Sequence, residues 1–473
     1  MSRNALRLTA LATAALLVPE GAHAAALDGA ALRWPWALPF LGILLTIATG
    51  PLLFPRIWHG HYGKLAIAWA ALTLAAVAAH FGFSTAVAAF AHIMLADYMS
   101  FILLLFSLYV VAGGILMTGN LRGTPLVNTL LLAMGTAAAS VIGTTGAAMV
   151  LIRPLLHANA PRLHNVHVVV FFIFLVANIG GALSPLGDPP LFVGFLRGVD
   201  FFWTAQQLWA PTLLTATTLL ALFLALDLWL YRKDQRAAPI GDAPLPLDLR
   251  LRGGINVVLI AAIIATILGA AAWQPGIEVE ILGTPLALQN LMRDGALLTI
   301  AVLSLVLTPN EHREANGFSW EPIREVAILF AGIFTCIIPV LAMLAAEKNG
   351  AFAWLFNFVT SAEGDPHNVS FFWLTGILSA VLDNAPTYLV FFELAGGDAR
   401  ELMGELAPTL KAISMGAVYM GALTYVGNAP NLMIYAIAVE RGVRMPSFFG
   451  YLGWSSVVLV PIFVLLTFLF VRV

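Results

Sequence analysis

The stretch that decides the fold is NIGGALSPLGDPP at residues 178–190, in the middle of an otherwise apolar run over residues 166–196. It holds three glycines and three prolines. Proline lacks the backbone donor and clashes with the preceding turn, so a helix cannot continue through this stretch. Unwound backbone at membrane depth is tolerated only where it is buried in protein or lines a cavity. We therefore predict a broken membrane helix here.

The composition of the whole chain supports a membrane location. The chain has 473 residues, of which 60% are hydrophobic and only 10% are charged. Soluble domains carry about 25% charged residues, so a soluble fold of this length could not hide its apolar surface. The formal net charge of -2 gives no support to a nucleic-acid partner. We predict an all-α, polytopic membrane protein.

Apolar segments and polar breaks divide the chain into two halves with the same rhythm. Each half contains three spans, a helical hairpin, a broken span and a final span. In the first half these segments cover residues 38–54, 65–80, 101–117, 126–156, 166–196 and 208–231. In the second half they cover residues 255–273, 296–307, 326–344, 371–394, 410–438 and 451–471. Residues 232–253 form a polar linker between the halves.

The N-terminus and the basic residues predict the orientation. Arg3 and Arg7 precede a short apolar stretch and the small-residue site Ala22-His23-Ala24, a pattern typical of a secretory signal peptide over residues 1–24. An uncleaved anchor is the alternative. Arginine and lysine gather in alternate loops, which places the mature N-terminus outside and the linker in the cytoplasm. Residues 25–231 and 254–473 then have opposite orientations, and such inverted repeats are typical of secondary transporters.

Four polar interruptions occur at matching places in the two halves. Two are hairpin tips near residues 142–146 and 382–387, and two are helix breaks near residues 178–190 and 425–431. The interval from tip to break is 40 residues between Thr145 and Pro185, and 46 between Asn384 and Pro430. Paired interruptions of this kind point to a transport site. The alternative is four independent proline kinks in an ordinary bundle.

Two carboxylates, Asp188 and Asp383, lie inside these interruptions. A charge at membrane depth costs about 2.5–3.5 kcal/mol on insertion scales, so it indicates function by default. We predict that both carry protons and that they bind Na⁺ together with Asn384, because hard cations prefer oxygen ligands. A helix cap is the alternative role for either aspartate. The further predicted ion- or substrate-binding residues are Thr144, Thr145, Asn178, Ser184, Thr387, Asn428 and Asn431.

At these four stretches the sequence resembles the ion transporter superfamily. NIGGALSPLGD at residues 178–188 and VLDNAP at residues 381–386 are similar to D-type bacterial sodium/proton antiporters. GNAPNLM at residues 427–433 is nearer to the citrate-transporter-like and arsenite-pump branches. The whole chain also resembles a bacterial group described both as sodium/proton antiporters and as citrate transporters. The resemblance implies an inner-membrane protein with a scaffold and a mobile transport domain, elevator-type movement and often a homodimer.

The predicted function is exchange of Na⁺ for H⁺ by a secondary active transporter. The alternative is cation-coupled uptake of citrate or a dicarboxylate. A polyanion site favours several buried cations, whereas only Arg153 is available and the two aspartates suit a cation. An ion gradient is the expected driving force, because the chain has no G-x-x-x-x-G-K-[ST] nucleotide loop. Without H-E-x-x-H or G-x-S-x-G motifs, neither enzymatic activity nor a cofactor is expected.

Overall fold

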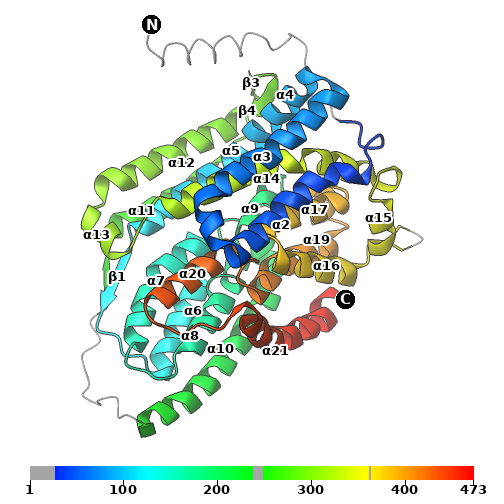
Figure 1. Cartoon of the computed structure of the whole chain (residues 1–473). Coiled ribbons are helices and arrows are strands. Elements are labelled where there is room, and N and C mark those ends of the chain that lie inside the picture. Colours follow the sequence, from blue (N-terminus) through cyan, green and yellow to red (C-terminus); the bar gives the residue numbers. More distant parts are fainter. Residues whose placement is uncertain (1–26, 238–248, 362–363, 473) are drawn as a thin grey trace. The chain divides into compact units, whose positions relative to one another are not determined.

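The computed structural model describes residues 27–237, 249–361 and 364–472 (Figure 1). The predicted signal peptide, residues 1–24, lies outside the described residues. Within them, ten helical stretches are long and apolar enough to cross a membrane. The chain is therefore a multi-pass membrane protein built almost wholly of helices, as the composition predicts.

The chain forms two compact units, and each gathers pieces of both sequence halves. Unit 1 contains the described residues up to Leu103 together with Gly269–Ala296 and Glu321–Trp354. Unit 2 contains Leu104–Leu268, Leu297–Trp320 and Leu355–Val473, within the described ranges. Compact units and sequence halves are therefore different divisions of the chain. The repeat of the two halves stays a prediction about the order of the helices along the chain.

Unit 1 is a small helical bundle in which α14 packs against α2 and α3. The long helical stretch Phe83–Gly113 starts earlier than the predicted span at residue 101. His92 and Asp97 interrupt the apolar pattern there, which hides the helix from a search for apolar runs. The elements of unit 1 are η1 (Trp34–Ala37), α2 (Leu38–Leu53), α3 (Pro55–Phe81), α4 (Phe83–His92), the π-helix η2 (Ile93–Tyr98), β3 (Glu278–Ile281), β4 (Thr284–Ala287), α14 (Glu321–Ala345) and η4 (Glu347–Asn349).

Unit 2 contains both hairpins and both broken helices. Its first series is β1 (Leu116–Gly119), α6 (Pro125–Ile142), α7 (Thr144–Asn159), α8 (Val166–Leu175), η3 (Ile179–Leu183), α9 (Pro189–Leu196) and α10 (Trp203–Ala237). Its second series is β2 (Leu249–Arg252), α13 (Asn310–Ala315), α16 (Asn368–Val381), α17 (Asn384–Leu394), α18 (Ala399–Met403), α19 (Ala407–Met420), η5 (Gly421–Leu423), α20 (Ala429–Glu440), α21 (Phe448–Leu466) and η6 (Thr467–Val471). Four helices contribute residues to both units: α5 (Met99–Gly113), α11 (Gly254–Ala272), α12 (Leu288–Leu307) and α15 (Ala353–Val359).

The predicted hairpins are pairs of helices that pack against each other, α6 with α7 and α16 with α17. At the first tip, Gly143 has φ 78°, a conformation that glycine adopts without steric cost. At the second tip, Asp383 accepts a hydrogen bond from the backbone of Ala385 and caps α17. The tips therefore reverse the chain by different local chemistry.

The broken helices form the centre of unit 2. Every residue of α8 from His167 to Leu175 is buried, which explains why this segment is apolar on all sides. The first break ends where Pro189 and Pro190 start α9, and the second ends where Ala429 and Pro430 start α20. Proline is well tolerated in a first helical turn, since its missing donor has no partner there. The breaks thus lie inside protein, as the sequence predicts.

Candidate functional site

Asp188 is the centre of a buried polar cluster in unit 2. Its side chain is 1% exposed, and both carboxylate oxygens accept hydrogen bonds. Oδ1 accepts from Asn428 Nδ2 at 2.9 Å and from Thr144 Oγ1 at 3.2 Å, and Oδ2 accepts from Asn384 Nδ2 at 2.7 Å. The donors come from both hairpin tips and from the second break. One carboxylate therefore joins all four interruptions that the sequence singles out.

The two aspartates differ in what their side chains do. Asp188 occupies the N-cap position of α9 but makes no side-chain cap bond, so its oxygens are directed to other elements. Asp383 caps α17 by accepting a hydrogen bond from Ala385 N at 3.2 Å. A helix cap is the alternative role that the sequence analysis gives for either aspartate. Asp383 is half-buried, and no hydrogen bond joins it to Asp188 among the described residues. Asp188 is the stronger candidate for an ion-binding carboxylate.

A second layer of amides holds the cluster in place. Asn428 Nδ2 also donates to Ala177 O at 3.0 Å and approaches Asn178 Oδ1 at 3.3 Å. Asn178 Nδ2 donates to Asn431 Oδ1 at 2.9 Å, and Asn431 Nδ2 donates to Gly421 O and Thr424 O, both at 2.9 Å. These amides fix the two breaks to each other. Asn178 and Asn431 thus support the site without a hydrogen bond to Asp188.

Four predicted residues lie outside this network. Ser184 donates to the backbone oxygen of Ser140. Thr387 donates to Asp383 O at 3.0 Å. Asp383 acts as the cap described above, and Thr145 is half-buried beside Thr144. The structure therefore brings Thr144, Asn178, Asp188, Asn384, Asn428 and Asn431 together, and it gives Ser184 and Thr387 hydrogen bonds to backbone oxygens.

The two breaks share a pattern that the sequence analysis did not use. GALSPLGDPP at residues 181–190 matches GALTYVGNAP at residues 421–430, at a constant interval of 240 residues (421 − 181). The contacts follow the pattern: Ser184 donates to Ser140 O, and Thr424 donates to Ala380 O, 240 positions later in each case. Asp188 then corresponds to Asn428, and Thr144 to Asn384. The interval from tip to break becomes 44 residues in both halves (188 − 144 and 428 − 384), in place of the unequal 40 and 46.

Glycine is required inside both breaks because two backbone segments touch. A Cβ on Gly187 would lie 2.1 Å from Gly181 O, and a Cβ on Gly427 would lie 2.6 Å from Gly421 O. Real Cβ atoms do not come so close to a carbonyl oxygen. Each of these glycines directly precedes a residue of the cluster, Asp188 or Asn428.

One buried oxygen of the cluster has no partner. Asn384 is 1% exposed, and its Oδ1 accepts no hydrogen bond among the described residues. A buried amide oxygen without a donor is unfavourable unless a water or a cation contacts it. Within the described part of the chain, no group of three or more His, Cys, Asp and Glu residues could hold a metal ion. A cation here would therefore have one carboxylate and neutral oxygens as ligands.

A comparison with known protein families shows the family to which the chain belongs. Residues 29–471 match the model of a family described as "Putative citrate transport". The chain belongs to this family. No curated protein matches the chain.

Membership in the citrate-transport family confirms the resemblance to citrate-transporter-like proteins and indicates a transporter. It agrees with the prediction that the chain is not an enzyme. It gives no support to sodium/proton antiport, and the predicted alternative, carboxylate transport, fits it better.

Proposed function

We propose that the chain is a secondary active transporter that moves citrate or a related small carboxylate together with a cation. The observation that carries this proposal is the meeting of four helix N-termini around one carboxylate. Thr144 begins α7, Asn384 begins α17, and Asp188 and Asn428 directly precede α9 and α20. Because Asp188 is hydrogen-bonded to the other three residues, all four N-termini lie together.

The N-termini supply the positive charge that the sequence seemed to lack. Each helix N-terminus acts as roughly +0.5 of an elementary charge and presents free backbone donors. Four of them amount to about +2, against one carboxylate at Asp188 and a second at the capping residue Asp383. Helix N-termini bind carboxylates and phosphates without a basic side chain. The buried arginines of the described chain, Arg162, Arg293 and Arg313, are not among the donors to Asp188, and this is therefore no argument against a carboxylate substrate.

A coupling cation would balance the remaining negative charge. We propose that Asp188 holds this cation, Na⁺ or H⁺, with the unpartnered Asn384 Oδ1 as a further ligand of Na⁺. Rotation of an asparagine amide by 180° exchanges its donor for its acceptor. Asn384 and Asn428 can thus donate to Asp188 in the absence of a cation and direct oxygens toward it when one is bound. In this scheme Asp383 and Thr145, half-buried at the tips, face the substrate.

We also propose that the two helix series are inverted repeats and that the whole site moves as part of unit 2. The GAL[ST]-x-x-G-[DN] pattern at an interval of 240 residues supports a repeat, and the distribution of basic loops supports opposite orientations. All residues of the cluster belong to unit 2, which an elevator mechanism requires. A homodimer in a bacterial inner membrane stays an expectation from the resemblance.

Sodium/proton antiport is the second candidate, favoured by the single buried carboxylate of the cluster. Uptake of labelled citrate into proteoliposomes that contain an interior pH dye distinguishes carboxylate symport from sodium/proton antiport. Labelled citrate should accumulate under an inward gradient of Na⁺ or H⁺, fail to accumulate in Asp188→Asn, and accumulate normally in Asp398→Asn. Asp398 is an exposed cap of α18, and asparagine also caps helices well. Proton efflux driven by Na⁺ in the absence of any carboxylate would favour antiport instead.

A further inference from the structure

One face of α10 is exposed along the whole helix, and nothing in the proposed transport cycle uses it. Exposed side chains recur every three or four residues, as expected for a single face of a helix. Between Trp209 and Trp229 this face is mostly apolar and includes Leu213, Leu222 and Leu228, and these five side chains are 40–62% exposed. Because α10 is apolar and long enough to cross a membrane, this part of the face contacts lipid.

Two tryptophans mark the ends of the apolar part of this face. Trp209 and Trp229 are 20 positions apart (229 − 209), which corresponds to about 30 Å along a helix that rises 1.5 Å per residue. The hydrocarbon core of a bilayer is also about 30 Å thick, and tryptophan is enriched at both of its interfaces with water. The two indole rings therefore place the boundaries of the hydrocarbon core on α10.

Three basic residues continue the same face beyond Trp229. Arg232, Lys233 and Arg236 are exposed, and they lie about 5–10 Å further along the helix than Trp229. The headgroup layer extends about 5–8 Å beyond the hydrocarbon core on each side of a bilayer. Lys233 Nζ also lies 5.9 Å from the centre of the Trp229 ring, so the basic part of the face directly adjoins the apolar part. The face therefore changes from apolar to basic at the depth of the lipid phosphates.

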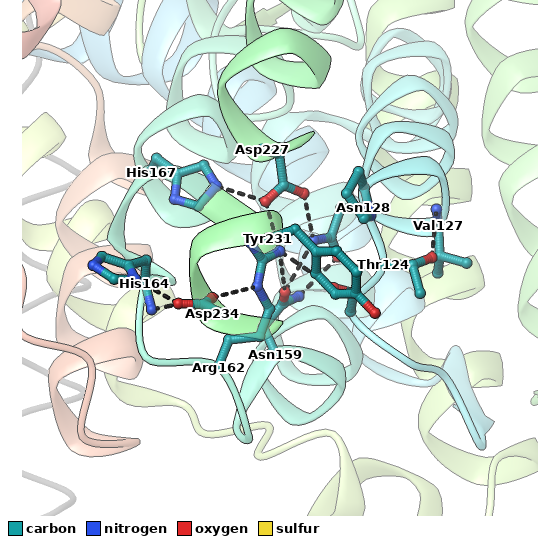
Figure 2. A network of polar contacts seen from close by, with 12 residues as sticks. Thr124, Val127, Asn128, Asn159, Arg162, His164, His167, Asp227, Tyr231 and Asp234 are labelled. Carbon is teal, nitrogen blue, oxygen red and sulfur yellow. Dashed lines mark hydrogen bonds and ion pairs between the residues drawn. The ribbon is translucent and has the colours of Figure 1, made fainter. Parts of the chain in front are cut away.

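The acidic residues of α10 lie on its buried face, so the exposed face of α10 itself carries only positive charges. Asp227 and Asp234 are at most 1% exposed, and both contact Arg162, which lies between α7 and α8 (Figure 2). Arg162 Nη1 is 2.5 Å from Asp227 Oδ1, and Arg162 Nε is 3.3 Å from Asp234 Oδ2. Asn128 on α6 donates a further hydrogen bond to Asp227 at 3.0 Å. These contacts attach the basic end of α10 to the base of the first hairpin.

We propose that the C-terminal end of α10 is a binding site for an anionic phospholipid. The acyl chains lie along Leu222 and Leu228, and the three basic side chains hold the phosphate and its headgroup. An anionic phospholipid is preferred over a zwitterionic one because a basic cluster attracts net negative charge at the membrane surface. Since Arg162 attaches the same end of α10 to the first hairpin, the bound lipid also supports the base of that hairpin.

Native mass spectrometry of the full chain, released from nanodiscs with equal amounts of phosphatidylglycerol and phosphatidylcholine, tests the proposal. The wild type should retain phosphatidylglycerol in preference. This retention should fall about tenfold or more in Arg232→Gln/Arg236→Gln, since each basic residue strengthens the attraction to an anionic lipid roughly fivefold. Arg441→Gln/Arg444→Gln removes the same charge from two exposed arginines after α20 and should leave the preference unchanged. No preference in the wild type, or equal losses in the two variants, overturns the proposal.

Quenching of Trp229 fluorescence by brominated lipids tests the depth and the site together, with Trp229→Phe as the blank. Bromines near the carbonyl end of the acyl chain should quench Trp229 more than bromines near the methyl end. Brominated phosphatidylglycerol should quench it more than brominated phosphatidylcholine, and this difference should disappear in Arg232→Gln/Arg236→Gln. Stronger quenching from the methyl end, or equal quenching by the two lipids in the wild type, contradicts the proposal. Both tests are independent of the transported substrate.

Discussion

Asn384 Nδ2 donates a 2.7 Å hydrogen bond to Asp188 Oδ2, across 196 positions of the chain. The bond joins the tip of the second hairpin to the break of the first broken helix. It also leaves Asn384 Oδ1 buried without a partner. Asn384 thereby connects the carboxylate to the oxygen that we propose as a cation ligand.

Asn384→Ala should weaken activation of transport by the coupling cation. The substitution removes the amide oxygen that we propose as a cation ligand. A polar contact to a charged group contributes about 1.5–3 kcal/mol, which corresponds to a change in affinity of about tenfold or more. We expect the Na⁺ concentration for half-maximal citrate uptake, or the corresponding proton concentration, to rise by that factor. Thr387→Val on the same helix is the control, because Thr387 donates only to the backbone of Asp383. Equal effects of the two substitutions would argue against a special role for Asn384.

Gly187→Ala should destabilise unit 2 itself. The added Cβ would meet the backbone oxygen of Gly181 at 2.1 Å, and backbone cannot move aside as a flexible side chain can. Overpacking typically costs about 1–3 kcal/mol, so the apparent Tm in detergent should fall clearly. Gly453→Ala, in α21, is the matched control, because a Cβ there meets no atom within 4 Å. An unchanged Tm for Gly187→Ala would show that the contact between the two glycines is not tight.

Ser184→Ala and Thr424→Ala should have similar, modest effects on stability. Each hydroxyl donates to a backbone oxygen of the neighbouring hairpin, at matching positions 240 residues apart. Loss of one such bond should cost about 1 kcal/mol, measured as a lower Tm, with the KM for citrate unchanged. A large rise of that KM in Ser184→Ala alone would return Ser184 to the substrate-binding role expected from the sequence.

Much of the fold could be predicted because glycine and proline interrupt the apolar runs so sharply. Three prolines and three glycines within residues 178–190 disfavour a continuous helix, and the structure breaks the helix there, whereas single prolines such as Pro339 lie inside helices. The start of α4 at Phe83 was missed because polar residues further along the same helical stretch lower its apolar character. Such a helix is recognised by its packing against α3 rather than by its composition.

The site was predicted less completely, because residue type does not reveal where a side chain points. Asp188 and Asp383 are both aspartates before a helix, yet only Asp383 caps its helix. The match between GALSPLGDPP and GALTYVGNAP was available in the sequence and would have paired Thr144 with Asn384. The partial positive charge of four helix N-termini near Asp188 could not be predicted from the sequence, because it depends on how the fold places the four helices.

Isothermal titration of citrate against the purified chain, at several Na⁺ concentrations and pH values, tests the central claim most directly. If Asp188 holds the coupling cation beside the substrate, the two affinities are linked and each ligand tightens the other. The dissociation constant of citrate should fall as Na⁺ or H⁺ rises in the wild type, and it should become independent of both in Asp188→Asn. Citrate binding that ignores both cations in the wild type, or keeps the same cation dependence in Asp188→Asn, would contradict the account.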